Sequence, residues 1–392
     1  MDTLISGLAS VIPFILLIGV VVMVHEFGHY LAGRAFGAAV ESFAFGFGRS
    51  LVEFKDKRGT RWRINWAPLG GFVKFSGEAQ APGDSVDAVG GLVGKPYQDL
   101  HPWQRVIVSL AGPLINFLFA IAVFAAMALA FGNPKFDRIS VAAIQSGSAA
   151  EAAGVMPGDV FVSAGGRSVS TPYDVQAATA YSAGDPVDFV LERAGERLVL
   201  SITPREQIRK DDRLGLEEPV GVIGVQMNAE YTGQQRVGPV GAVVLGANQT
   251  ADIIGQTVKV LGRLVTGREN FDRMRGPLGI GDLADRVVDS HLKQMDVPMS
   301  ARLYNVFIEL AQYAALFSVS IGFFNLLPIP MLDGYSALLG LYETVFGGVL
   351  PEKAQSILLH GGLAAIGLFF IAVTWNDLKR IGVLEVFGRL LS

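Results

Sequence analysis

Long apolar stretches constrain this chain more than any other feature of its sequence. Four of them contain no Asp, Glu, Lys or Arg, and they lie at residues 4–24, 106–131, 310–332 and 357–375. A helix that crosses a bilayer needs about 20 predominantly apolar residues. Only 17% of the residues are charged, whereas soluble chains average roughly a quarter. We therefore predict an α-helical polytopic membrane protein with four transmembrane helices.

Between and after these stretches, the sequence predicts a β region, a small domain and an amphipathic helix. Residues 34–104 contain two strand-like runs, at 40–54 and 60–75, and the Gly70-Gly71 pair supplies a turn or bend, so we predict a membrane-associated β-hairpin region. Residues 136–207 combine a short helix with alternating apolar runs, which predicts a small α+β domain. Apolar residues recur at helical spacing over 238–268, so this helix packs either on a protein core or on the membrane surface. The transmembrane segments with their flanking residues are placed at 1–33, 105–131, 305–334 and 355–377.

The distribution of charge predicts which side of the membrane each part faces. Asp2 is the only charged side chain before the first apolar stretch, whereas Arg34 and Arg49 follow it. Lys and Arg favour the cytoplasmic side, so we expect residues 34–104 in the cytoplasm and the N-terminus outside. With four crossings, the second returns the chain to the extracytoplasmic side before the 136–207 domain, and the fourth places the C-terminus there as well. A net charge of −4 gives no reason to expect a nucleic-acid partner.

The strongest indication of chemistry is an H-E-x-x-H motif, His25-Glu26-Phe-Gly-His29, at the end of the first apolar stretch. On a helix, a spacing of four residues puts both imidazoles on one face, close enough to bind one zinc ion. Ionisable residues at membrane depth are costly, so they indicate function. The chain contains no cysteine, which excludes thiolate ligands and cysteine nucleophiles. We expect peptide hydrolysis by a zinc-activated water, with Glu26 as the general base.

A catalytic zinc site usually takes three protein ligands and a water, so one ligand is still needed. The candidates near the other apolar stretches are Asp333, His360 and Asp377. Asp333 is favoured because Pro328 and Pro330 break the preceding helix and allow the chain to turn toward a metal. An ionised carboxylate in an apolar site also needs a cation beside it, whereas His360 lies in a regular helical stretch. The expected ligands of one zinc ion per chain are His25, His29 and Asp333.

Residues that contact the substrate are suggested by two further features. Asn116 and Asn325 are amides within apolar segments, and they either donate to the substrate or make hydrogen bonds between helices. The apolar run at 62–75 forms either a strand edge that accepts an unwound substrate or an ordinary cytoplasmic hairpin. The candidate substrate-binding residues are Asn116, Asn325, Gly70, Gly71, Phe72 and Val73.

Three motifs, in this order along the chain, resemble those of the site-2 protease family of intramembrane zinc metalloproteases. They are His25-Glu-Phe-Gly-His29, Gly112-Pro-Leu-Ile-Asn116 and Asn325-Leu-Leu-Pro-Ile-Pro-Met-Leu-Asp-Gly334. The segments at 42–48 and 68–74 are similar to the bacterial branch that includes the regulator of sigma-E protease. The resemblance covers nearly the whole chain. It implies that His25, His29 and Asp333 bind zinc and that Glu26 is the catalytic base.

The resemblance also implies roles for the other domains. The hairpin would enter the membrane and present the substrate, and the 136–207 domain would be a periplasmic PDZ domain that filters substrates and contacts peptides or partners. The amphipathic helix at 238–268 is similar to the helix that follows the PDZ region in that branch. The best-known member of the branch carries tandem PDZ domains, whereas the length available here leaves room for one. The expected location is the bacterial inner membrane, with the active site toward its cytoplasmic half.

The sequence thus favours an intramembrane zinc endopeptidase that acts in regulated intramembrane proteolysis. Its expected substrates are single-span membrane proteins such as anti-sigma factors, and the lipid bilayer is its other partner. The alternative is a non-enzymatic membrane scaffold whose PDZ-like domain recruits partners. Both explain the apolar stretches, but only the enzyme explains zinc-ligand side chains at membrane depth.

Overall fold

The fold is described from a computed structural model that covers residues 2–77, 91–211, 216–269, 277–294 and 296–380. The described residues divide into two compact units. Unit 1 comprises those within 1–124, 246–254 and 274–392, and unit 2 those within 125–245 and 255–273. We describe each unit by itself.

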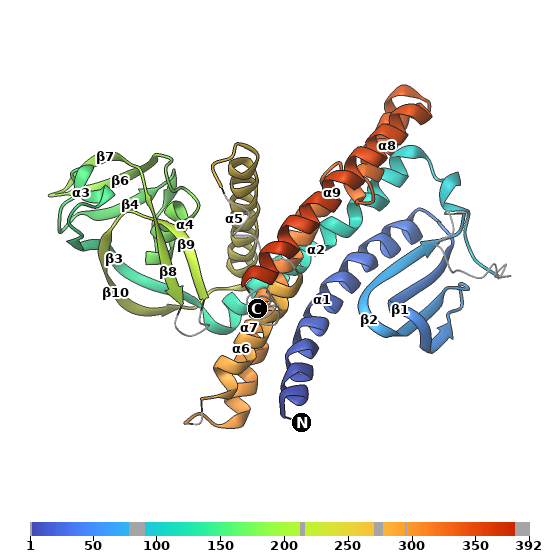
Figure 1. Ribbon diagram of the computed structural model, residues 1–392, viewed down its shortest axis with the longest axis horizontal. Coiled ribbons are helices and arrows are strands. Elements are labelled where there is room, and N and C mark those ends of the chain that lie inside the picture. The colour runs from blue at the N-terminus through green and yellow to red at the C-terminus, as the bar shows by residue number, and fades with distance from the viewer. Residues whose placement is uncertain (1, 78–90, 212–215, 270–276, 295, 381–392) are drawn as a thin grey trace, which may run out of the picture. The chain divides into compact units, whose positions relative to one another are not determined.

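Long helices dominate unit 1 (Figure 1). Three described helices are long and apolar enough to cross a membrane: α2 (Pro102–Phe131), α7 (Met299–Asn325) and α9, which runs from Glu352 to Arg380. The first expected crossing lies in α1 (Asp2–Ala35). Its 34 residues extend about 51 Å at 1.5 Å per residue, so the helix exceeds the roughly 30 Å of a hydrocarbon core. Three of the described helices are therefore candidate crossings by length and composition, and the crossing by α1 stays a prediction.

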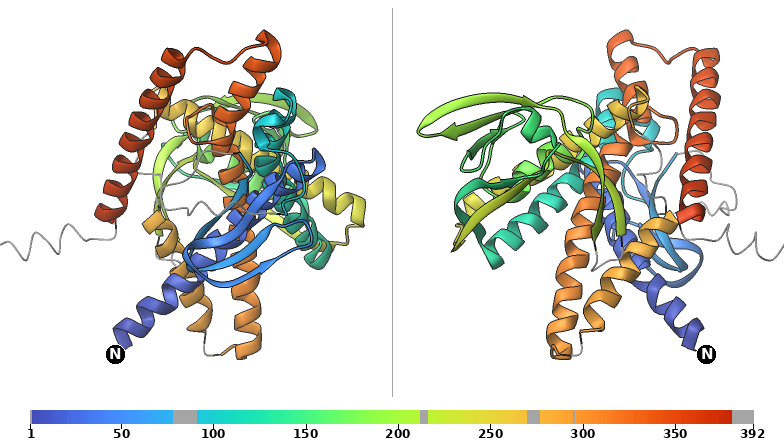
Figure 2. Two further views of the ribbon diagram at one scale, coloured as in Figure 1. Left: turned by 90° about the vertical axis from the view of Figure 1, so that its right-hand side faces the viewer. Right: turned by 60° about the vertical axis from the view of Figure 1, so that its left-hand side comes forward.

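The third apolar stretch contains the break that its prolines predict. Within the segment at 305–334, α7 ends at Asn325 and a separate helix, α8 (Asp333–Phe346), follows the break. Pro328 and Pro330 lie in this break, where a missing N–H and a restricted preceding residue prevent a continuous helix. The structure therefore places Asp333 at the start of a helix. Figure 2 shows α8 and α9 running in opposite directions.

The β region of unit 1 is a strongly curled hairpin. Strands β1 (Val40–Lys55) and β2 (Arg61–Phe75) pair so that Phe43 lies opposite both Trp62 and Val73, while Phe54 also lies opposite Trp62. The two strands thus form four segments in the order 50–55, 61–65, 42–45 and 71–75. The 71–75 segment is consequently an edge.

Glycines on α1 allow this sheet to pack closely against the helix. A Cβ atom at Gly33 would lie 2.1 Å from the ring of Phe75, and one at Gly19 would lie 2.8 Å from the ring of Phe45. The predicted hairpin is therefore present and held on α1. The segment at 79–94, whose content of Gly, Asp and Ala predicts a loop, lies mostly outside the described residues. A short 3-10 helix, Tyr97–Asp99, precedes α2.

Unit 2 contains an antiparallel sheet with strand order β10-β3-β4-β6-β7, in which β5 also pairs with β4. Its core includes the buried side chains of Phe161, Phe189, Leu191 and Ile202. The strands are β3 (Asn133–Ile144), β4 (Val160–Ala164), β5 (Arg167–Ser168), β6 (Val187–Arg193), β7 (Glu196–Ile202) and β10 (Val225–Gln235), and the helices are α3 (Ala149–Ala152) and α4 (Pro172–Ala180). The domain is α+β as expected. Its sheet extends beyond the predicted 136–207 because β10 pairs with β3.

Four further elements complete the described chain. Strands β8 (Arg205–Asp211) and β9 (Leu216–Val222) form a separate two-stranded sheet in unit 2. The amphipathic helix is α5 (Pro239–Val265). Helix α6 (Pro277–Leu292) packs against α1 and α7 in unit 1 and was not predicted from the sequence.

Candidate metal centre

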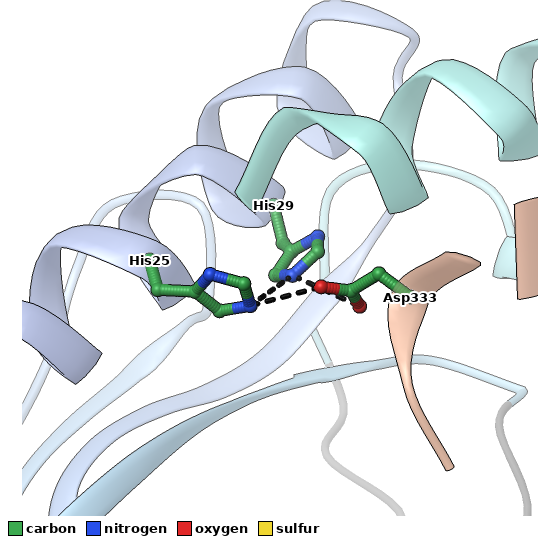
Figure 3. A group of neighbouring side chains, drawn as sticks. All are labelled: His25, His29 and Asp333. Atoms are coloured by element: carbon green, nitrogen blue, oxygen red, sulfur yellow. Dashed lines mark hydrogen bonds and ion pairs between the residues drawn. The ribbon is translucent and has the colours of Figure 1, made fainter. Parts of the chain in front are cut away.

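Two histidines of α1 and the first residue of α8 converge in unit 1 (Figure 3). His25 Nε2 lies 3.2 Å from His29 Nε2 and 2.9 Å from Asp333 Oδ2, and His29 Nε2 lies 3.3 Å from Asp333 Oδ1. Both histidines are buried and Asp333 is partly exposed. Tetrahedral zinc with bonds of about 2.0–2.1 Å separates its ligand atoms by roughly 3.3 Å. The donor atoms and their spacing therefore fit a zinc ion.

The structure brings Asp333 to the histidines but leaves His360 elsewhere. His360 is exposed on α9, where its Nδ1 lies 2.7 Å from the Ser356 carbonyl oxygen. The turn into α8 depends on Gly334, because a Cβ atom there would lie 2.3 Å from the Leu326 carbonyl oxygen. An ion pair between Glu343 of α8 and Arg105 of α2 holds the same helix farther along. Asp333 is thus presented by a helix fixed at both ends.

Helix α2 forms the wall behind both imidazoles. His29 Nδ1 donates to the Val108 carbonyl oxygen at 2.8 Å, which leaves Nε2 free to face Asp333. A Cβ atom at Gly112 would lie 2.3 Å from His29 Nε2 and 2.8 Å from His25 Cε1. Only glycine leaves the rings where they are. Gly112 belongs to the motif at 112–116, but its sequence alone predicts no role for it. The contact of the Val108 carbonyl has no side-chain signal in the sequence.

Asn116 and Asn325 lie at opposite nitrogens of the His25 ring. The Asn116 amide nitrogen is 3.2 Å from His25 Nδ1, and its residue is fully buried. The Asn325 amide nitrogen is 3.3 Å from His25 Nε2, the nitrogen that faces Asp333. Asn325 therefore borders the candidate metal position, whereas Asn116 lies behind the ring.

Glu26 contacts the edge of the curled hairpin. Its Oε2 accepts a hydrogen bond of 3.0 Å from the Val73 N–H. The Ser76 N–H bonds to Ala39 within the sheet, so strand alternation turns the N–H groups of Gly71 and Val73 outward. The Gly71 Cβ position is also 3.9 Å from Glu26 Cγ. The predicted residues Gly70, Gly71, Phe72 and Val73 thus lie along or beside the strand edge that meets Glu26, a long-range contact without a local sequence signal.

A candidate metal-ligand cluster beside a glutamate, among helices apolar enough to cross a membrane, is typical of a membrane metalloprotease. Comparison with known proteins agrees, because residues 13–369 match the family model described as Peptidase family M50. The chain belongs to this family, to which the site-2 proteases belong, and the predicted resemblance is confirmed. It is a zinc metalloendopeptidase, and zinc is its cofactor.

Relatives in several organisms share this assignment over almost their whole length. A predicted zinc metalloprotease of Mesorhizobium japonicum is 37% identical over 95% of this chain and 99% of its own length. Metalloprotease MmpA of Caulobacter vibrioides is 35% identical over 99% of this chain and 100% of its own length. A predicted zinc metalloprotease of Agrobacterium fabrum is 36% identical over 95% of this chain and 96% of its own length.

Proposed function

We propose that this protein is an intramembrane endopeptidase that cleaves transmembrane segments of single-span membrane proteins, anti-sigma factors or similar regulators among them. The observation that carries the proposal is the convergence of His25, His29 and Asp333 between helices apolar enough to cross a membrane. A peptidase that acted only on soluble proteins would gain nothing from placing costly polar side chains there. We propose that α1 is the fourth helix that crosses the membrane.

The proposed mechanism assigns a separate task to each side chain. His25 and His29 hold the metal through Nε2, and Asp333 holds it through its carboxylate. Zinc, when bound, lowers the pKa of a coordinated water and polarises a peptide carbonyl. Glu26 takes a proton from the attacking water and passes it to the leaving amine. Asn325 donates hydrogen bonds to the carbonyl oxygen that gains charge or to the substrate backbone.

We infer that the substrate is presented by the 71–75 edge. A peptide bond within a helix must first be freed from its helical hydrogen bonds, and the released groups need new partners in a membrane. An open strand edge supplies them by β-addition, and this edge contacts Glu26. The exposed side chains of Phe47, Leu51, Phe54 and Trp66 on the same sheet support its association with lipid.

Single-cysteine cross-linking tests this presentation, because the chain contains no native cysteine. In a Glu26→Gln background, which traps bound substrate, Phe72→Cys forms a disulfide with a cysteine near the cleaved bond of the substrate. The control is Phe54→Cys, which lies on the opposite edge of the sheet. Equal cross-linking at both edges would exclude selective strand addition.

We propose a regulatory role for the two elements that follow the second crossing. Unit 2 acts as a PDZ-like domain in the periplasm and filters substrates or binds a peptide, and the active site lies toward the cytoplasmic half of the bacterial inner membrane. Exposed valines on α5 (Val240, Val243 and Val258) support its placement on the membrane surface. Deletion of unit 2 residues 136–207 should change which substrates are cut without abolishing hydrolysis.

Co-expression with single-span substrates tests the whole proposal. Glu26→Gln keeps the size of the side chain but cannot take up a proton, so cleavage stops while zinc stays bound. The scaffold alternative predicts instead that the wild type captures partners and cuts none. Substantial cleavage by purified Glu26→Gln would remove this residue from the mechanism.

A further inference from the structure

The side chain of Asn116 faces the far side of the His25 ring and is fully buried in α2. Its amide nitrogen lies 3.2 Å from His25 Nδ1, while its Oδ1 is buried without a hydrogen-bond partner among the described groups. We propose that Asn116 is a positioning residue that selects the His25 tautomer able to bind zinc. The proposal rests on the proposed ligation of zinc by His25.

The two orientations of the amide correspond to two tautomers of His25. With Nδ2 toward the ring, Nδ1 accepts, so the ring proton lies on Nε2 and points to Asp333. A half turn of the amide exchanges Nδ2 with the unpartnered Oδ1. Oδ1 then accepts from Nδ1–H, and the Nε2 lone pair is free for the metal. Asn116 thus makes for His25 the bond that the Val108 carbonyl makes for His29.

The surroundings of Asn116 argue against its two other predicted roles. A substrate contact requires access, but the residue is fully buried and lies at the ring nitrogen opposite Nε2. The hydrogen bond that links this position to α7 uses the backbone, because Ser318 Oγ donates to the Asn116 carbonyl oxygen at 3.0 Å. The side-chain amide is therefore left for His25.

This arrangement separates the side-chain role of Asn116 from helix packing. Asn116→Leu keeps the approximate shape but removes the acceptor, so the zinc dissociation constant should rise about 10–100-fold. Asn116→Asp presents only acceptors, so zinc binding should stay within about threefold of the wild type. Ser318→Ala is the matched control, since it removes a buried bond at the same helix contact without touching the amide.

The experiment measures zinc affinity of the purified full chains by competition with a chelator, together with kcat and KM on a single-span substrate. Wild-type zinc affinity in Asn116→Leu with a reduced kcat would overturn the proposal and indicate a substrate contact. An equal loss of zinc in Asn116→Leu and Asn116→Asp would also overturn it. Asn116→Ala, which lacks the acceptor as well, replaces the leucine variant if that variant does not fold.

A reference variant distinguishes this inference from the proposed function. His25→Ala should lose most of its zinc. If His25→Ala keeps zinc, the ligand assignment itself is wrong. If His25→Ala loses zinc while Asn116→Leu binds it normally, only the positioning role of Asn116 fails.

Discussion

Replacement of Gly112 by alanine provides a severe test of the metal centre, because it adds one methyl group against the rings of both histidines. The new Cβ atom would lie 2.3 Å from His29 Nε2, whereas ordinary contacts begin near 3.4 Å. The ring or α2 must therefore move by about 1 Å, while metal–ligand distances tolerate only about 0.2 Å. We expect zinc affinity to fall about 10–100-fold and kcat/KM to fall about 100-fold.

The assay for Gly112→Ala compares zinc affinity, cleavage and thermal unfolding in the same purified samples. Alanine favours helix over glycine by roughly 0.5–1 kcal/mol, so the variant should remain folded. Gly367→Ala in α9 is the control, because no heavy atom lies within 4 Å of its Cβ position. Wild-type zinc affinity in Gly112→Ala would refute the argument that α2 fixes the position of the imidazoles.

Three further predictions concern the third ligand, the substrate contact and unit 2. Asp333→Ala should lose most bound zinc and all cleavage, whereas His360→Ala should keep its zinc and its activity. If zinc analysis finds zinc retained in Asp333→Ala and lost in His360→Ala, then His360 is the third ligand. Asn325→Leu should bind zinc normally and lose about 100–1,000-fold in kcat, so an unchanged kcat would exclude a substrate role. The Arg193 guanidinium holds the pKa of the Asp159 carboxyl below its ordinary value, so this pair stabilises unit 2 above pH of about 4 and loses its effect as the pH falls. Arg193→Gln should melt below the wild type at pH 7, and the two melting temperatures should converge in acid; a constant difference would contradict this linkage.

The candidate ligands that the structure brings together could be predicted from the sequence because their signals are local. His25 and His29 follow helical spacing, and two prolines indicate the chain break before Asp333. The position at which the helix resumes was missed, since the start of α8 depends on the close approach of Gly334 to the Leu326 carbonyl oxygen. A pattern of apolar residues does not report such a backbone contact.

The pairing of strands that are distant in the sequence could not be predicted from local patterns either. The alternating runs predicted two strands, but not that Phe43 would lie between Trp62 and Val73 and so create an edge at Glu26. In unit 2, the strand β10 lies outside the predicted 136–207 domain, because it pairs with β3 through a long-range ladder that no local pattern reports. Local periodicity identifies which face of a strand is apolar, whereas its neighbours are set by the whole fold.

The organisation of the metal centre follows from the packing of two helices, although one of them supplies no proposed ligand. Val108, Gly112 and Asn116 are spaced by four residues, so they form one row on α2. His29 meets Val108, His25 meets Asn116, and Gly112 lies against both rings. The histidine row of α1 therefore packs on the α2 row in antiparallel register. Gly28 permits this approach, since a Cβ atom there would lie 2.4 Å from the Ala111 carbonyl oxygen. Because the contacts at both Nδ1 atoms come from α2, the packing of these helices sets the ring orientations before a metal binds.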